Sequence, residues 1–354
     1  MAKDMTKGSP ARHILGFAIP IFIGSIFQQF YNIVDTMIVG RFVGVNALAA
    51  VGSTSSIMFC VQGIAMGMTT GFGVVVSQAF GAKNEKELRH SVAMSAWLTI
   101  LLSAVVTTGL LIANKPLLRT MNTPDEIFGG ASTYLTIIFA GFCATMAYNL
   151  FAAVLRAIGD SKTPLYFLII SSGLNIVLDL VFVINFKMGV GGVAYATVIA
   201  QAVSAALCFI YMKKKYPEVM NASTEEKKFS VKSAGRLMGM GLPMALQFSI
   251  TALGTMIVQS ALNLLGETAI AAYAAAQKLQ GLVGQPYVAL GTAMATYSGQ
   301  NAGAGDYKRI RDGFKKCMLI LTVTVAITFV LARAFGGFGT MLFVDGSETE
   351  VIRL

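Results

Sequence analysis

The sequence predicts an all-α protein that crosses a membrane many times and is built from two copies of one repeat. Three observations lead to this fold class. Hydrophobic residues make up 55% of the 354 residues and charged residues only 12%, whereas a soluble domain usually carries about a quarter charged residues. The apolar residues form runs of about 20 or more, the length of a membrane-spanning helix. One run, with the loop that follows it, recurs later in the chain.

Nine apolar segments are long enough to span a bilayer. Each is expected to be a helix, because a helix satisfies its own backbone hydrogen bonds in lipid. The first segment is too long for a cleaved signal peptide, so we expect it to be retained. The predicted spans are 14–39, 47–76, 92–114, 130–155, 164–186, 190–212, 237–264, 268–298 and 314–335.

Lysine and arginine residues gather in alternate loops. Twenty lie on the side of the N-terminus, six lie on the opposite side, and Lys278 lies inside the eighth span. Cytoplasmic loops of membrane proteins carry such an excess, so we expect a plasma-membrane protein with a cytoplasmic N-terminus. The net charge of +10 therefore indicates membrane-flanking loops and no nucleic-acid partner.

The repeat is visible around the second and eighth spans. Residues 77–90 (SQAFGAKNEKELRH) align with residues 299–312 (GQNAGAGDYKRIRD), so that Gln78 pairs with Gln300 and Gly81 with Gly303. Pro20 and Pro243 also correspond, near the starts of the first and seventh spans. Six spans per repeat return the chain to its starting side, so the two repeats should run parallel, a known plan of transporters.

This repeat predicts three regions. They are an N-terminal six-helix lobe (1–212), a charged cytoplasmic linker (213–236) and a second lobe (237–354) that holds only helices 7–9 of an expected twelve. Two full repeats would need more residues than this chain has, so we expect it to be C-terminally truncated.

Two carboxylates lie deep in the predicted spans, Asp35 in the first and Asp179 in the fifth. Asp35 follows Gln28 and Asn32 on one helix face, and Asp179 follows Ser171 and Asn175 on another, because helical side chains three to four positions apart share a face. Both acids are expected at a similar depth, roughly 7–12 Å from the outer surface. Acids inside a membrane usually face a cavity or a partner. They could also serve only as hydrogen-bond partners of neighbouring helices.

Two neighbouring acids in a desolvated cavity favour the neutral form of a carboxyl group, which suits a proton-coupling site. The same acids, with Asn175, could instead bind Na⁺ through oxygen ligands. Further residues that could line a cavity are Gln28, Asn32, Gln247 and Lys278. The four cysteines lie singly in apolar runs and only two histidines are present, so no other metal site and no cofactor are expected.

Four segments together resemble the multidrug and toxic compound extrusion (MATE) family: VDTMIVGR with Asp35, LRAIGDSKTP from Leu155, NIVLDLVFV from Asn175 and GQNAGAGD from Gly299. The resemblance implies two six-helix bundles around a central cleft, and export of cationic, amphiphilic compounds in exchange for H⁺ or Na⁺. It also implies a cation-coupling network of Asp35, Asp179, Asn175, Tyr134 and Thr197. The seventh span lacks the acid that some sodium-type members carry there, which favours H⁺.

We therefore expect a monomeric, ion-coupled antiporter rather than an enzyme, with small molecules and the lipid bilayer as its partners. Two alternatives remain. A flippase for lipid-linked saccharides would need a cationic cleft, for which Lys278 is the only deep candidate. A polytopic membrane enzyme would need a catalytic set, and none is visible in the sequence.

Overall fold

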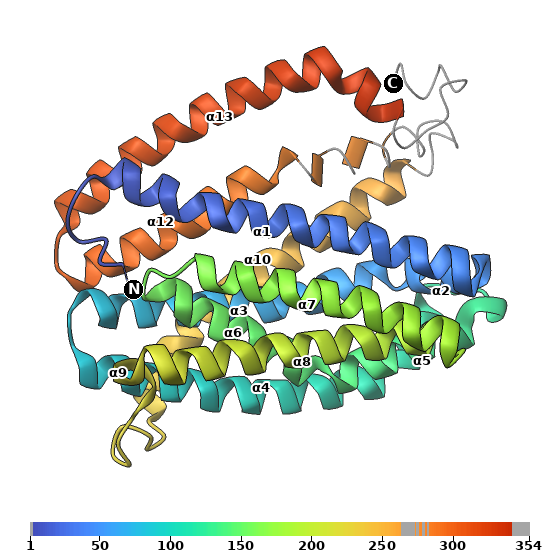
Figure 1. Cartoon of the computed structure of the whole chain (residues 1–354), viewed down its shortest axis with the longest axis horizontal. Helices are drawn as coiled ribbons and strands as arrows, with labels where there is room; N and C mark the ends of the chain where they lie inside the picture. The colour runs from blue at the N-terminus through green and yellow to red at the C-terminus, as the bar shows by residue number, and fades with distance from the viewer. Residues whose placement is uncertain (1–2, 263–272, 274–275, 278–279, 282, 342–354) are drawn as a thin grey trace.

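The computed structural model describes residues 3–262, 273, 276–277, 280–281 and 283–341. In this part of the chain every regular element is a helix, and most helices run side by side along one axis (Figure 1). The first half contains α1 (Pro10–Ile38), α2 (Val45–Ser53), α3 (Ser55–Gly81), α4 (Glu85–Thr120), α5 (Asp125–Ala140), α6 (Phe142–Ala157), α7 (Lys162–Leu180) and α8 (Gly189–Lys215). After the short α9 (Pro217–Met220) come α10 (Val231–Leu262), α12 (Gln285–Gly303) and α13 (Tyr307–Met341).

Six of the described helices are long and apolar enough to cross a membrane, or seven if α5 and α6 form one bent span. They correspond to predicted spans one to six and nine. The other two predicted spans, 237–264 and 268–298, overlap α10 and α12 and extend into residues outside the described part. The all-α, polytopic membrane fold is thereby confirmed.

Two predicted spans are each divided into two helices. The span at 47–76 breaks at Thr54, between α2 and α3, where the Thr54 hydroxyl donates to the Val51 carbonyl at 2.7 Å. The span at 130–155 bends by 48° at Gly141, between α5 and α6. A Cβ at Gly141 would lie 2.3 Å from Val198 of α8, so only glycine allows the bend to approach α8 so closely.

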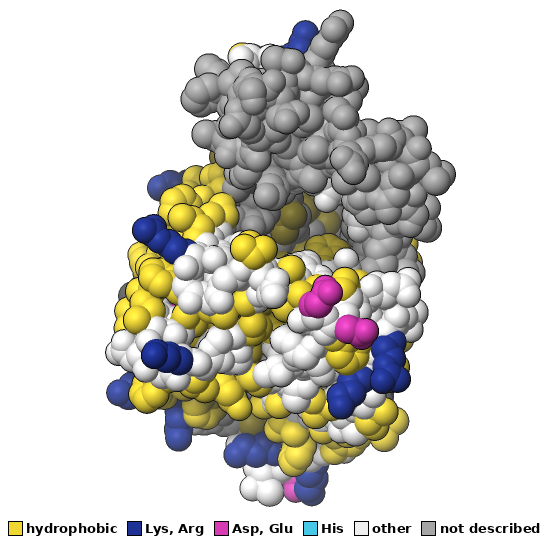
Figure 2. Space-filling model, turned by 90° about the vertical axis from the view of Figure 1, so that its right-hand side faces the viewer, with side chains coloured by type: hydrophobic (Ala, Val, Ile, Leu, Met, Phe, Trp, Pro, Cys, Tyr) yellow, Lys and Arg dark blue, Asp and Glu magenta, His cyan; other side chains and the backbone are white. Residues whose placement is uncertain are grey.

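One end of the bundle carries the N-terminus and the α3–α4, α6–α7, α8–α10 and α12–α13 connections (Figure 1). We call it the basic end, because the predicted basic loops are here. The opposite end carries the α1–α2, α4–α5 and α7–α8 connections. Figure 2 shows that uncharged side chains cover much of the described surface at this opposite end, with separate charged residues among them.

At the basic end, α3 and α12 cross at repeat-related positions. A Cβ at Gly81 would lie 1.8 Å from the Gln300 carbonyl oxygen, and a Cβ at Gly303 would lie 1.9 Å from the Gln78 carbonyl oxygen. The repeat pairs Gln78 with Gln300 and Gly81 with Gly303. Each glycine therefore packs against the glutamine of the other helix, so the two contacts are equivalent. The two copies of the repeated segment therefore pack against each other about a local twofold relation.

Glycines also set the contact between α3 and α10. Added Cβ atoms at Gly67 and Gly71 would lie 2.5 Å from Ala245 Cα and 2.4 Å from Gly241 Cα. The two helix backbones can approach this closely only without side chains between them, as small residues allow in membrane helices. Under the repeat, α1 corresponds to α10 and α3 corresponds to α12. The contact between α3 and α10 is accordingly matched by a contact between α12 and α1.

The segment before α1 is inserted between the two halves at the basic end. Met5 is completely buried, and its N–H donates to Gln300 Oε1 at 2.8 Å. Arg309, near the start of α13, donates to the Met5 carbonyl at 3.0 Å and to the Gly8 carbonyl at 2.8 Å. On the other side, the Lys3 N–H donates to the Ile158 carbonyl of the first half at 3.0 Å. Residues 3–8 thus connect the α6–α7 loop to α12 and α13.

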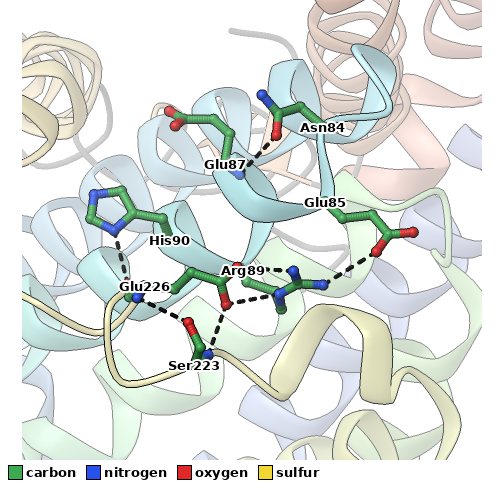
Figure 3. A network of polar contacts seen from close by, with 7 residues as sticks. All are labelled: Asn84, Glu85, Glu87, Arg89, His90, Ser223 and Glu226. Carbon is green, nitrogen blue, oxygen red and sulfur yellow. Dashed lines mark hydrogen bonds and ion pairs between the residues drawn. The ribbon is translucent and has the colours of Figure 1, made fainter.

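The connection between α9 and α10 is attached to α4 by a polar network (Figure 3). The Arg89 guanidinium donates to both carboxylate oxygens of Glu226, each at 2.9 Å. The His90 ring contacts the Glu226 carbonyl at 2.8 Å and the Ser233 hydroxyl at 2.9 Å. A two-point ion pair of this kind fixes orientation as well as distance, so the connection has a defined position on the first half.

Candidate functional site

The two intramembrane acids lie on neighbouring helices near the end opposite the basic end. Asp179 of α7 is completely buried, and Asp35 of α1 is partly buried. Helices α1 and α7 pack against each other, and the two carboxyl groups lie within hydrogen-bonding range of each other. The two acids are therefore direct neighbours across the α1–α7 contact.

Asn175 and Thr197 extend this pair toward α8. In the amide orientation that satisfies both of its groups, Asn175 donates to Asp179 Oδ2 at 3.0 Å and accepts from the Thr197 backbone N–H at 3.1 Å. Asn175 is 1% exposed, so this orientation gives both its N–H and its C=O group a partner in a site that is closed to water. The Thr197 hydroxyl donates to the Val193 carbonyl at 3.0 Å.

Two tyrosines complete the cluster. Tyr134 of α5, 7% exposed, lies close enough to both acids to interact with them electrostatically. Tyr31 of α1, one turn before Asp35, lies beside Thr197 and near the same acids. The structure therefore brings Asp35, Asp179, Asn175, Tyr134 and Thr197 together. The structure also places Tyr31 in this cluster, which the sequence analysis did not predict. Its position one helical turn before Asp35 could have indicated this.

Each acid is followed by a π-helical turn. Val39–Val43 (η1) begins four residues after Asp35, and Val181–Asn185 (η2) begins two residues after Asp179. The two turns contact each other. Such turns are rare and occur often at functional sites. Here they widen both helices at the same level, next to the acid pair.

Two carboxylate oxygens in this cluster have no hydrogen-bond partner among the described residues. They are Asp35 Oδ1 and Asp179 Oδ1, and both atoms are inaccessible to solvent. An unpaired, buried anionic oxygen is costly, and two ionised carboxylates at this separation repel each other. A single proton on the pair converts this repulsion into a hydrogen bond, and a small cation would also relieve it. The cluster is therefore suited to bind a positive charge.

The other predicted cavity-lining residues do not join this cluster. Gln28 and Asn32 of α1 and Gln247 of α10 have exposed side chains. Gln28 and Asn32 share α1 with the site, whereas Gln247 lies on a helix of the second half, and the structure places none of the three in the buried part of the site. Lys278 lies outside the described residues.

The family model MatE matches the chain at residues 20–181 and 243–353. The two segments begin at Pro20 and Pro243, the prolines that the repeat pairs. Two Bacillus subtilis proteins, described as probable multidrug resistance proteins YoeA and YpnP, are each 29% identical to this chain. Both matches cover 99% of this chain, and they cover 77% of YoeA and 78% of YpnP. The multidrug export protein MepA of Staphylococcus aureus is 23% identical over 75% of this chain and 59% of its own length.

Solved structures show the same fold. A multidrug resistance MATE family transporter of the MOP superfamily, described in an outward-facing conformation, superposes with a TM-score of 0.92 at 23% identity. That match covers 99% of this chain and 78% of the other. A MOP superfamily transporter from Pyrococcus furiosus gives a TM-score of 0.90 at 24% identity, over 99% of this chain and 77% of that one. With a family model that matches most of its length and relatives that are multidrug resistance proteins, the chain belongs to the MatE family of multidrug efflux transporters.

Proposed function

We propose that this transporter exports cationic, amphiphilic compounds across the plasma membrane in exchange for protons, and that Asp35 and Asp179 carry the coupling proton. The paired, buried carboxyl groups with one unpartnered oxygen each support this proposal most directly. Asn175, Thr197 and Tyr134 would position the pair. The orientation with a cytoplasmic N-terminus, the lobe boundaries and the monomeric state belong to the same proposal.

The acid pair supplies a physical basis for exchange. With one proton bound, the carboxyl groups hold α1 and α7 together through a hydrogen bond. Without it, two negative charges face each other in a desolvated site, and both charges attract a cation. Protons and a cationic substrate would therefore compete for one state of the first half. A ligand shifts a conformational equilibrium only through such differential affinity.

The test is transport into proteoliposomes that contain the purified protein and a fluorescent cationic dye. An imposed pH gradient should drive dye movement, and Asp35→Asn and Asp179→Asn should each reduce its rate by more than about tenfold. Asp125→Asn is the matched control, because it removes an exposed carboxylate from the first turn of α5. If both substitutions leave pH-driven transport intact, the coupling assignment is wrong.

Sodium is the alternative coupling ion, because Asn175 and the acids offer oxygen ligands. A sodium gradient imposed without a pH gradient should give no dye movement if protons couple transport. If sodium alone drives dye movement and Asp179→Asn abolishes that movement, then sodium is the coupling ion. The proposed site would stay the same.

A further inference from the structure

A small cavity lies where α3 and α6 of the first half meet α12 of the second. Its volume is about 20 Å³, and its polar lining comes from Arg156, Thr70, Thr292 and Thr296. Small and apolar side chains of the same helices make up the rest of the wall. One water-sized particle needs about 10–15 Å³, so the cavity has room for a single small ligand. It lies toward the basic end, away from the acid pair.

Arg156 is the charged group in this lining. Its guanidinium offers five N–H donors and cannot be neutralised in a protein. In the part of the chain that the structure describes, it forms neither an ion pair nor a hydrogen bond. The ionisable groups that interact with it are Tyr148 and Cys208, a phenol and a thiol. By contrast, Arg89 at the same end is paired with Glu226 and Glu85. A partly buried charge without a counter-ion is unfavourable.

The hydroxyl groups add further donors. Thr70 and Thr296 make no side-chain hydrogen bond to a described residue, although Thr296 is only 7% exposed. Thr292 already donates to the Val288 carbonyl at 2.9 Å. The polar lining is thus one permanent cation and two free hydroxyl donors, and it contains no carboxylate. Such a lining is complementary to an anion.

The position of the cavity connects it to both halves of the protein. Thr70 and Thr292 are equivalent under the repeat, as are Val74 and Thr296, and all four line the cavity. It therefore lies near the local twofold relation of the α3–α12 crossing. A ligand here would contact Arg156 from the first half and Thr296 from the second at the same time.

We propose that this cavity is an anion site, in which a small monovalent anion of the size of chloride binds between the Arg156 guanidinium and the hydroxyl groups of Thr70 and Thr296. The bound anion compensates the charge of Arg156 and links α12 to α3 and α6. It stabilises the arrangement in which the two halves are in contact at the basic end. This site does not depend on the proton-coupling pair.

The experiment measures the melting temperature of the purified protein in detergent while chloride replaces gluconate at constant ionic strength. Gluconate is too large for the cavity, so the melting temperature should rise with chloride and saturate. Arg156→Gln should abolish the rise, whereas Arg89→Gln should retain it. Thr296→Val should weaken the apparent chloride affinity by about tenfold, because it removes one hydrogen bond to a charged group. Thr292→Val should change the affinity less, since that hydroxyl is already engaged.

Formate serves as the small carboxylate in a parallel titration. A response to formate without one to chloride would overturn the assignment to a halide-sized anion. No chloride-specific rise in the unsubstituted protein, or an equal rise in Arg156→Gln, would overturn the site altogether. If Arg156→Gln does not fold, the shifted chloride dependence of Thr296→Val decides the question.

Discussion

The acid cluster and the α3–α12 crossing lie toward opposite ends of the molecule and are built on different principles. The cluster is built from side chains of the first half, and Val258 occupies the position in α10 that corresponds to Asp35. The crossing consists of backbone contacts in which both repeats take equal parts. Steric fit at the crossing is thus shared between the halves, whereas the described acid cluster draws its ionisable groups from the first half. The close packing at the crossing therefore requires matching residues in both repeats, whereas the acid pair is formed within one of them.

The largest expected effect is at the acid cluster, where the two acids should act as one unit. If a shared proton is the coupling species, Asp35→Asn and Asp179→Asn should each reduce pH-driven dye transport by more than about tenfold. The double substitution should then cause no further loss, since residues that act together are not additive. Initial transport rates in proteoliposomes measure this. Independent, multiplicative losses would show that the acids have separate roles.

The crossing should respond symmetrically to added bulk. Gly81→Ala and Gly303→Ala each place a methyl group within 2 Å of a carbonyl oxygen of the other helix. Each should destabilise the protein by about 1–3 kcal/mol, the usual range for overpacking, and by similar amounts. Thermal unfolding in detergent provides the measurement.

Gly109→Ala is the control for these two variants, because a Cβ at this position in α4 would meet nothing within 4 Å. It should leave the melting temperature unchanged or raise it slightly, since alanine is the better helix former. A damaging Gly81→Ala together with a silent Gly303→Ala would break the reciprocal relation.

A smaller effect is expected at the attachment of the α9–α10 connection to α4. Hydrogen bonds from Arg89 and from the Ser223 backbone lower the pKa of Glu226 to about 2. A lowered carboxyl pKa means that the contribution to stability is present above the ordinary value and is lost as the pH falls through about 2. Cleavage of residues 221–230 by an acid-active protease should therefore stay slow from pH 7 down to pH 4.

Glu226→Gln should increase this cleavage throughout that pH range. Glu225→Gln is the matched control, because the Glu225 side chain is 79% exposed and, among the described residues, its ion pair is with the nearby Lys228. Equal cleavage of the two variants would show that the ion pair of Arg89 and Glu226 does not hold the connection in place.

Part of this architecture was predictable from local sequence. The apolar runs gave the membrane helices, and the pairing of Gly81 with Gly303 indicated the repeat before its reciprocal packing was seen. Helical spacing placed Asn175 and Asp179 on one face, and the family resemblance supplied Tyr134 and Thr197. These features were accessible because they depend on periodicity or on similarity between segments.

Other features were not predictable, for identifiable reasons. The π-helical turns after Asp35 and Asp179 each contain one residue more than an α-helical turn. The sequence of an apolar run does not reveal this extra residue, because its neighbours are apolar as well. The bend at Gly141 depends on Val198, more than 50 positions away in the sequence. The cavity beside Arg156 depends on three helices, while the sequence alone places Arg156 among the loop basic residues.

The position of Met5 has a consequence for the order of synthesis. Its hydrogen-bond partner Gln300 lies 295 residues further along the chain. At about 5–20 residues per second, translation from one to the other takes on the order of 15–60 s. Met5 is thus synthesised long before the residue that fixes its final position. The initial segment must stay accessible at the membrane surface until α12 and α13 have been inserted, and only then can it join the two halves.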